Sequence, residues 1–550
     1  MSGGLLNLVS ENSFSDILFG NPQKTLFKVK YCKITNFGLQ HLRLDYLGSR
    51  DLRLTEESTF VFKVKRYAEL LMDTYLVVNL PDIWSPVYYP NTKNGNQWSS
   101  YDFRWIKNIG TNMIKEVHIT CGSLTLQKYS GEYINAQVER DYTAEKRELF
   151  HRMTGHTDEL NDVGNIATRL NAYPSAYYTE NAAGAEPSIR GRQLYIPLNA
   201  WFSNPGLAFP LIGLQYNELQ ISITLRSIDE LFQVRDVFDP QNNFPYIKPD
   251  MNQEQFQMYR FLQSPPAEEI DESAYENKTK MWNADIHLIA TYCFLSKEEA
   301  TVFASESQVY LIKDIFEYDF QNIVGTNKLK LTSNGMVASW MFYLQRNDVN
   351  MRNEWSNYTN WPYANIPSDI VPALPPRETP TAKYPYGPFL NPDTNSRTGI
   401  YITGDYSTDN QKEILQTFGI QCDGLYRENV LPESIFNYVE KYSRTRGAAM
   451  DGLYCYNFCL NTDFFLSSQP SGAINMSKFK DVFLEISTFV PAVDYTNSNF
   501  NVICDGNGNV LGVQKQNWRL FEYSFNMRVF EERYNVLSFI GGNAGMLYSR

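Results

Sequence analysis

The chain has 550 residues and a formal net charge of −12, and 43% of its residues are hydrophobic and 15% aromatic. Binding to phosphates needs clustered Lys and Arg, so the acidic balance excludes direct contact with nucleic acid as a main function. Only 20% of the residues are charged, and most apolar runs are short. This composition favours strands and loops over helices and predicts an all-β protein.

Length and cysteine content bound the organisation further. A length-based prior suggests about three or four domains, but β-sandwiches run to roughly 200–250 residues as one unit, so we expect two. Seven cysteines are an odd number at low density, which favours free thiols over a disulfide framework. No stretch approaches the roughly 20 apolar residues of a membrane span, and the amino terminus lacks the order of a signal peptide. We therefore expect synthesis and folding in the cytosol.

The amino-terminal segment, residues 1–24, is predicted to be an arm. It carries a small apolar patch among several glycines, formed by Leu5, Leu6, Leu8 and Val9. We expect this arm to pack on something else. The alternative is a frayed terminus, because chain ends are commonly mobile unless they are tied down.

Residues 25–228 are predicted to form a first β-sandwich. Short runs rich in β-branched and aromatic residues, bounded by Gly, Pro, Asn or Asp, are typical of this fold. The predicted strands cover residues 26–34, 60–66, 70–81, 113–127, 194–198 and 219–225. The strand at 219–225 alternates apolar and polar residues, so we expect one face to pack on the core and the other to face solvent. Helix formers after Thr143 predict a short helix to Phe150, and residues 153–190 are predicted to be a long loop.

Residues 229–280 form a proline-punctuated connector, and we place the domain boundary there. The second unit, residues 281–550, repeats the strand pattern. Its first predicted strands cover residues 284–295, 309–321, 328–333 and 337–346. Ser296 begins a helical turn with capping-box spacing, and a helix is expected from Pro432. A large loop insertion spans about 350–450.

The stretch from Leu453 to Val490 contains two predicted strands joined by a punctuated turn. In Gln469-Pro470-Ser471-Gly472, proline at the second position and glycine at the fourth predict a β-turn. After it, Val482, Leu484, Ile486 and Val490 alternate with Phe483 and Phe489, so both faces of this strand are expected to be covered. The intervals 195–221 and 456–484 both run strand, Pro/Gly turn, strand. An internal duplication is the simplest explanation.

The run QPSGAINMSKF, between two late strands, resembles the signature turn of the major capsid proteins of nucleocytoplasmic large DNA viruses. Residues 20–37, 209–223 and 528–549 resemble the first strand, the end of the first jelly roll and the closing strand of the same family, in the expected order. The resemblance implies two consecutive jelly-roll β-sandwiches with long loop insertions and a few short helices. The residues that it assigns to the signature turn are Gln469, Pro470, Ser471, Gly472, Asn475 and Ser477.

The resemblance also implies a structural function. Three chains would form a pseudo-hexagonal capsomer that tiles the icosahedral outer shell of a large DNA virus. The implied partners are other capsomers, minor capsid and penton proteins and an internal viral membrane, with assembly in the host cytoplasm. Loops near residues 84–111, 153–190 and 350–450 would form subunit clasps and an outward tower. The family pattern is not matched at residues 10–15, 91–101 and 350–406.

Motifs that carry catalysis, cofactors or metals are not evident. His151 and His156 have no Cys or carboxylate pair at ligand spacing, so surface histidines are expected instead of a metal site. Cys455 and Cys459 share a strand face but are spaced too far apart along it to bond. Asp505 begins a run that resembles a calcium loop, but it lacks the Gly and Glu that such a loop needs, and a hairpin turn is expected. We expect neither an enzyme nor a cofactor.

Two observations leave alternatives open. Sequons stand at Asn277, Asn357 and Asn475, but a cytosolic product would not meet the glycosylation machinery. A lectin-like or carbohydrate-active β-sandwich is the competing function, in which exposed aromatic residues stack against sugars. The candidate aromatic residues are Trp355, Trp361 and Tyr363. That function also needs a carboxylate pair or a calcium site, and the sequence offers neither.

Overall fold

The computed structural model describes most of the chain. The described ranges are 3–5, 13–48, 51–86, 101–166, 169, 172–176, 186–236, 245–266, 275–363, 411–448, 450–463, 469–491, 501–504, 510–514, 518–520 and 522–548. For residues 13–15, 501–504 and 510–514 only the backbone is described.

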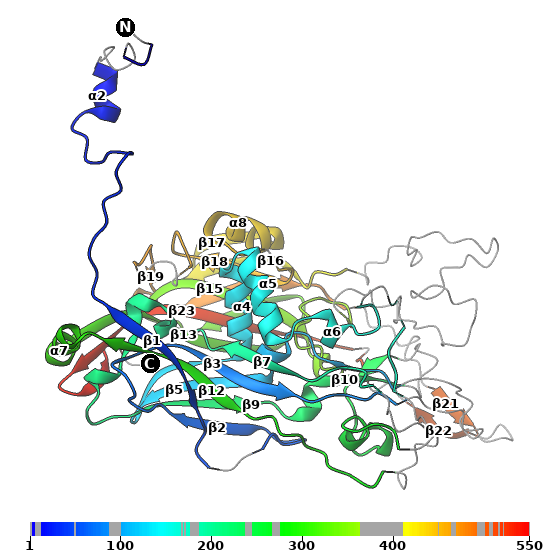
Figure 1. Cartoon of the computed structure of the whole chain (residues 1–550). Helices are drawn as coiled ribbons and strands as arrows, with labels where there is room; N and C mark the ends of the chain where they lie inside the picture. The colour runs from blue at the N-terminus through cyan, green and yellow to red at the C-terminus, as the bar shows by residue number, and fades with distance from the viewer. Residues whose placement is uncertain are drawn as a thin grey trace.

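The first half of the chain builds two antiparallel sheets that face each other (Figure 1). Their orders are β1-β12-β3-β7 and β2-β9-β5-β6. The strands are β1 (Phe37–Leu44), β2 (Ser58–Lys63), β3 (Leu70–Leu80), β5 (Ile114–Cys121), β6 (Leu124–Tyr129), β7 (Arg192–Pro197), β9 (Leu219–Leu225) and β12 (His287–Leu295). A short strand, β8 (Phe209–Pro210), also pairs with β3.

The second half repeats this plan. Its sheets have the orders β13-β23-β15-β18 and β14-β20-β16-β17, so corresponding strands take corresponding places in the two halves. The strands are β13 (Gln308–Ile323), β14 (Thr326–Leu331), β15 (Met336–Arg346), β16 (Leu415–Cys422), β17 (Leu425–Pro432), β18 (Leu453–Asn457), β20 (Val482–Thr488) and β23 (Phe525–Ile540). The prediction of an all-β fold with two jelly rolls is confirmed.

The remaining elements are short. The other strands are β4 (Phe103–Trp105), β10 (Phe232–Arg235), β11 (Tyr246–Ile247), β19 (Ile474–Asn475), β21 (Asn501–Cys504), β22 (Val510–Gln514) and β24 (Asn543–Met546). The helices are α2 (Ser13–Phe19), α3 (Ile109–Met113), α4 (Gly131–Asp141), α5 (Ala144–Thr154), α6 (Asp158–Asn161), α7 (Lys297–Ser305) and α8 (Glu440–Arg444), the last preceded by a π-helical turn (Ile435–Val439). Strands β21 and β22 pair as the expected hairpin, whose turn lies outside the described residues.

The predicted strand at residues 26–34 is wrong. Every residue from 16 to 40 is exposed, including Phe27 at 99%, and the first strand begins only at Phe37, where β12 supplies a partner. The stretch has the side-chain pattern of a strand, but no strand among the described residues pairs with it. Figure 1 shows this segment leaving the body as an arm.

Three other strand predictions need correction. Residues 113–127 are two strands, because Gly122 turns the chain with a φ of 61°. The segment 284–295, assigned to the second unit, contains β12, which pairs with β1 and β3 of the first half. The predicted connector also contains β10 and β11, which extend a small sheet that begins at β4. Chain order therefore does not separate the halves cleanly.

The strands on either side of the signature turn do not pair with each other. β18 lies in the sheet with β15, and β20 lies in the sheet with β14 and β16, so the intervening chain crosses from one sheet to the other. On β20 one face is buried, but Phe483 on the other is half-buried with the Lys328 ammonium 5.0 Å from its ring centre. Of the side chains expected to be covered, Phe489 is buried, whereas Phe483 is half-buried and Val490, placed on the inner face, is exposed. Both faces are therefore covered only in part.

Three helix predictions are confirmed. α5 follows Thr143 as expected, and the Ser296 hydroxyl accepts a hydrogen bond from the Glu299 backbone N–H, 3.4 Å, at the start of α7. The helix expected after Pro432 is the π-helical turn and α8. α4 is not predicted, because polar and charged residues lie among its apolar residues and all of them are buried.

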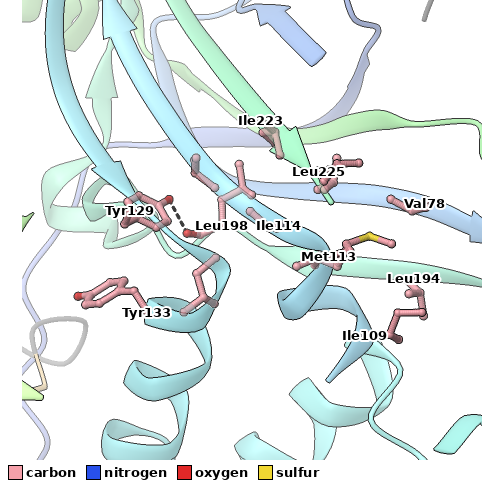
Figure 2. Packing of buried hydrophobic residues seen from close by; sticks show 14 of the residues in the cluster. Val78, Ile109, Met113, Ile114, Tyr129, Tyr133, Leu194, Leu198, Ile223 and Leu225 are labelled. Carbon is pink, nitrogen blue, oxygen red and sulfur yellow. Dashed lines mark hydrogen bonds between the residues drawn. The ribbon is translucent and has the colours of Figure 1, made fainter. Parts of the chain in front are cut away.

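Two apolar cores fill the sandwiches. One lies within the second half and includes Trp340, Phe342 and Leu484. The other fills the first half and extends into the second, where Met341 and Phe530 belong to it. Figure 2 shows part of this larger core around α3 and α4, where the Tyr129 hydroxyl donates to the Leu198 carbonyl at 2.6 Å.

Candidate functional site

The helix α4 joins the two halves. All of its residues are buried, and its first residue must be small, since a Cβ on Gly131 would lie 1.9 Å from the Thr111 carbonyl oxygen. The Ser130 hydroxyl caps the helix by accepting a hydrogen bond from the Tyr133 N–H, 3.3 Å. The ring of Tyr133 meets the ring of Phe530 on β23 edge to face, with centres 5.7 Å apart. The helix therefore packs against the sheet of the second half.

A buried ionic cluster fixes the carboxyl end of α4. The Arg140 guanidinium donates to Asp141 at 2.7 Å and to Glu532 of β23 at 2.8 Å. Lys313 of β13 lies 3.3 Å from the same Glu532 carboxylate, and Ser339 of β15 donates to it at 2.7 Å. Burial alone would raise the pKa of Glu532, but Arg140 and Lys313 outweigh burial and hold the pKa well below its usual range. The junction therefore contains ionised groups that depend on each other.

A second ionic contact lies at the amino end of α4. Glu132 pairs with Arg226 of the first half at 2.7 Å and with Arg528 of β23. The Tyr343 hydroxyl of β15 donates to the same carboxylate at 3.1 Å. Both ends of the helix are thus bound to the sheet β13-β23-β15-β18. Removing one member of such a buried set leaves an uncompensated charge, which costs more than the pair itself contributes.

The edges of two sheets also meet at the junction. The Gln127 side chain of β6 donates to the Lys313 carbonyl of β13 at 3.1 Å. The Ser130 N–H donates to the Glu317 carboxylate of β13 at 2.7 Å. Burial raises the pKa of Glu317 to about 7, despite these hydrogen bonds from Ser130. The last strand of one sheet and the first strand of another therefore shield each other.

A third buried cluster holds the loop that follows β15. The Asp348 carboxylate accepts from Arg346 at 2.6 Å, from Arg352 at 3.0 Å and from the Leu520 N–H at 2.9 Å. Burial would raise the pKa of Asp348, but the two guanidinium groups hold it well below its usual range. The cluster anchors the start of the predicted loop insertion to the segment before β23. Residues 364–410 of that insertion lie outside the described residues.

The predicted signature turn, residues 469–477, contacts the chain that leaves β18 and the start of β15. Ser471 exchanges hydrogen bonds with Asn461: its hydroxyl donates to the Asn461 carbonyl at 2.9 Å and accepts from the Asn461 N–H at 3.0 Å. Gly472 has a φ of 138°, and a Cβ there would lie 3.0 Å from the Phe458 carbonyl oxygen. The turn is therefore pressed against the chain that leaves β18. Gln469 and Pro470 are exposed at its start.

The end of the same turn contacts the start of β15. Asn475 pairs with Met336 in a short two-strand ladder, and its side chain accepts from the Ser477 N–H at 3.1 Å. The Ser477 hydroxyl accepts from the Gly335 N–H at 2.8 Å. Met476 between them is fully buried. The structure thus brings all six predicted residues into one clasp, while their role as a family signature stays a prediction.

The residues of the competing carbohydrate hypothesis are not available for stacking. Tyr363 is buried against Trp518, and Trp355 is half-buried, with Arg226 over its ring and its indole N–H donating to the Glu230 carbonyl at 3.0 Å. Trp361 is half-buried, with Lys412 over its ring. These aromatic groups pack within the protein. Of the sequons, Asn357 is buried, and Asn475 is occupied in the turn just described.

The candidate metal-binding and reactive residues show no site. The rings of His151 and His156 lie 4.5 Å apart, and His151 contacts the Glu139 carboxylate at 3.1 Å. In the described part of the chain, no group of three His, Cys, Asp or Glu side chains could hold a metal ion. Within the same ranges, no helix is long and apolar enough to cross a membrane. Cys455 and Cys459 are free and buried.

Comparison with known proteins assigns the chain to a family. Residues 25–264 match the family described as major capsid protein N-terminus, and residues 299–545 match large eukaryotic DNA virus major capsid protein. The major capsid protein of Phaeocystis pouchetii virus is 23% identical over 598 residues and covers 100% of both chains. That of Paramecium bursaria Chlorella virus 1 is 24% identical over 556 residues, again covering 100% of both.

Solved structures share the fold. A quasi-atomic model of the PBCV-1 virus capsid superposes with a TM-score of 0.59 at 20% identity, covering 96% of this chain and 100% of that chain. The Faustovirus major capsid protein gives a TM-score of 0.57 at 10% identity, covering 93% and 92%. The repeated jelly roll and both family matches define a structural protein of a viral capsid. The chain belongs to the major capsid proteins of nucleocytoplasmic large DNA viruses.

Sequence reasoning missed the residues that join the halves. Arg140 and Glu132 lie in a helix that was not predicted, and Glu532 lies in a closing strand that was matched only by resemblance. A signal was present: Glu531, Glu532 and Arg533 are consecutive charges in the middle of a strand, and all three are buried. Buried charges inside a strand need partners, which here come from distant parts of the chain.

Proposed function

We propose that three copies of this chain form a pseudo-hexagonal capsomer and that capsomers tile an icosahedral outer shell. The observation that carries this proposal is the repeated strand order, which gives each chain two similar blocks joined rigidly through α4. Three chains would then supply six similar blocks. The closed symmetry of most homo-oligomers favours such a ring over an open chain of subunits.

The proposal extends to the surroundings of the shell. Capsomers would assemble in the host cytoplasm, contact minor capsid and penton proteins, and lie over an internal viral membrane. The net charge of −12 supports a shell that does not hold the genome directly. The chain would have no catalytic role, because its buried ionic clusters are satisfied by structural partners. The predicted insertion 350–450 is too long, because β16 and β17 lie within it and complete a sheet of the second roll. The loops before β4, between α6 and β7 and between β15 and β16 would supply subunit clasps and the outward tower.

We also propose how the chain divides. Residues 1–24 would act as an arm that engages a neighbour. Residues 25–36 would belong to the same arm, because they are exposed and outside any sheet. The first roll would start at β1 and include β12, because β12 completes its sheet, and the second would start at β13. The clasp formed by Gln469 to Ser477 would hold the second roll closed by tying the chain after β18 to the start of β15.

Native mass tests the proposal. Light scattering at several protein concentrations and moderate salt should give a stable particle of three 63.6 kDa chains. Negative-stain images of that particle should then show a ring with six lobes, and concentrated samples should form sheet-like arrays. A protein that stays monomeric on concentration would contradict the capsomer.

A further inference from the structure

The two halves are equivalent beyond their strands. β6 ends one sheet of the first half and leads directly into α4. β17 ends the equivalent sheet of the second half and leads directly into residues 435–444, the π-helical turn and α8, which we call the α8 segment. The same element therefore follows the same strand in each half.

The surroundings of the two elements differ. α4 is completely buried, because it lies on the sheet β13-β23-β15-β18 and is bound there by Arg140, Glu132 and Tyr133. The α8 segment buries only the side that faces its own roll, through Phe436, Asn437 and Lys441.

The opposite side of the α8 segment carries exposed apolar groups. Tyr442 is 94% exposed, Val439 is 52% exposed, and Tyr438 is also exposed. Tyr442 follows Tyr438 by four positions and Val439 by three, so both lie on the same side of the segment as Tyr442. Single exposed apolar residues are common, but a stripe of two tyrosines and a valine is a typical interface composition. The stripe needs a surface to cover it.

A matching surface exists on the first half. The sheet β1-β12-β3-β7 is the counterpart of the sheet that α4 covers. On its outward face Phe37 and Leu39 of β1 are 51% and 54% exposed, whereas their partners on β12, Leu295 and Cys293, are half-buried and buried. The open part of this face is therefore the edge formed by β1. His41 continues this face, where its ring contacts Thr291 at 3.0 Å. In the equivalent place on β13, residues Ile312 to Ile315 are buried.

We propose that the α8 segment of one copy packs on the outward face of β1-β12-β3-β7 of the next copy, as α4 packs within the chain on the equivalent sheet. The inference rests on the self-assembly proposed above and names its contact surfaces. Each copy gives one segment and receives one, so the contact is heterologous and closes only as a ring. Tyr442 is its central side chain, because aromatic residues buried at the middle of an interface contribute most to binding.

The first test separates assembly from folding. Tyr442→Asp places a charge on the stripe and should raise the protein concentration of half-dissociation at least tenfold in light scattering. Because Tyr442 touches little of its own chain, the far-UV circular dichroism and the unfolding temperature of the dissociated chain should not change. The matched control is Tyr216→Asp, an exposed tyrosine (74%) in the first half, which should leave assembly unchanged. Equal assembly of the Tyr442→Asp variant and the wild type would overturn the inference.

The second test identifies the receiving face. A chain with Leu39→Cys and Tyr442→Cys is treated with bismaleimides of increasing length. Its background carries Cys32→Ser, which removes the one exposed thiol among the described side chains, and Cys504→Ser, whose side chain lies outside them. Cross-linked dimers and trimers should appear on denaturing gels, and mixing tagged and untagged chains should show that the links join different copies. Tyr442→Cys paired with Ile540→Cys, an exposed position at the end of β23, is the control and should give none.

The outcomes distinguish the two proposals. A trimer by light scattering without a Leu39–Tyr442 cross-link would leave the capsomer intact and refute this contact. A cross-link confined within single chains would also refute it. A wild-type chain that is monomeric at every concentration would refute both.

Discussion

The sheets β1-β12-β3-β7 and β13-β23-β15-β18 occupy equivalent places in the two halves, but they are covered differently. The first strand of one, β1, is exposed along most of its length, whereas the centre of its counterpart β13 is buried under the first half. The same topology therefore produces one sheet whose first strand is open on its outward face and one sheet whose first strand is covered at its centre, although the outward side of β12, at Thr291 and Cys293, is buried within the chain. The open face on the first half is where the structure leaves room for another molecule.

Strands with two covered faces differ from strands with one in the burial of their successive side chains. On β15, Trp340 and Phe342 point into the core of the second half, while Met341 and Tyr343 point into the core shared with the first. A strand covered on both faces is a continuous apolar run, as β15 is, because each successive side chain meets a different core. β9 and β20 instead alternate buried and half-buried residues, as strands with one core face do.

The largest expected effect comes from breaking the buried junction. Arg140→Met removes the partner of Asp141 and Glu532 and leaves two carboxylates buried, so it should lower the free energy of unfolding by about 3–5 kcal/mol. Urea denaturation followed by tryptophan fluorescence measures this loss. Arg152→Met, which breaks an exposed ion pair with Glu148 on α5, is the control and should cost less than about 1 kcal/mol. Equal losses would contradict an energetically important junction.

The next largest effect compares the two cores at one equivalent position. Ile223 of β9 and Ile486 of β20 are the third inward side chains of corresponding strands, and both are fully buried. Ile→Ala at either site should lower the free energy of unfolding by about 2–5 kcal/mol, because it removes buried methyl groups and leaves a cavity. Hydrogen exchange should distinguish them: Ile486→Ala should increase exchange in strands of the second half, including β15 and β23, and should leave β5 and β9 unchanged.

Ile223→Ala should also increase exchange in β15 and β23, since the core of the first half includes side chains of these strands. If the increase stays within the first half, the two cores are energetically separate. If Ile486→Ala spreads into β5 and β9, the second core is not self-contained.

A smaller effect is expected at the clasp of the second half. Gly472→Ala should cost about 1–3 kcal/mol, because its φ of 138° is unfavourable for other residues and the new Cβ would contact the Phe458 carbonyl. Gly424→Ala is a matched control, with a φ of 83° but open space around the added methyl group. Differential scanning fluorimetry should show the larger loss for Gly472→Ala. The reverse order would mean that the clasp does not press on β18.

The smallest effect depends on pH. The pKa of Glu317 is raised to about 7 at the junction, whereas an unfolded Glu titrates near roughly 4.3. The folded state therefore binds the carboxyl proton of Glu317 more tightly than the unfolded state does. Below the unfolded pKa the group does not affect stability, and as the pH rises from the unfolded pKa to the folded pKa it increasingly destabilises the folded state. Glu317→Gln should raise the melting temperature at pH 8 more than at pH 4. An equal shift at both pH values would contradict the raised pKa, and Glu56→Gln on the surface should show no shift.

Local pattern predicted much of the fold. Alternation identified β9 and β20, the Ser296 cap identified α7, and the continuous run from Val337 to Arg346 identified β15. These features depend on residues within a few positions of each other, which is the range over which strand and cap preferences act. The turn from Gln469 to Gly472 was predicted for the same reason, because proline and glycine restrict or permit backbone angles locally.

Partner choice was not predictable from the same patterns. Residues 26–34 have the side chains of a strand but no partner strand, while β12 pairs across the predicted domain boundary with β1. The junction was missed because Arg140 and Glu532 are 392 positions apart, and nothing local indicates that a helical arginine meets a strand carboxylate. Only the packing of α4 on the second-half sheet brings them together.

The sequence by itself determined the all-β class, the duplication and the family, because these are carried by composition, repeated strand patterns and short motifs. The tertiary structure decided which strands share a sheet, which face of each sheet is covered and which charges are buried. The physical reason is that pairing and burial depend on the surface that each element meets. Here the equivalent elements α4 and the α8 segment meet different surfaces within the chain, so one is buried and the other remains exposed.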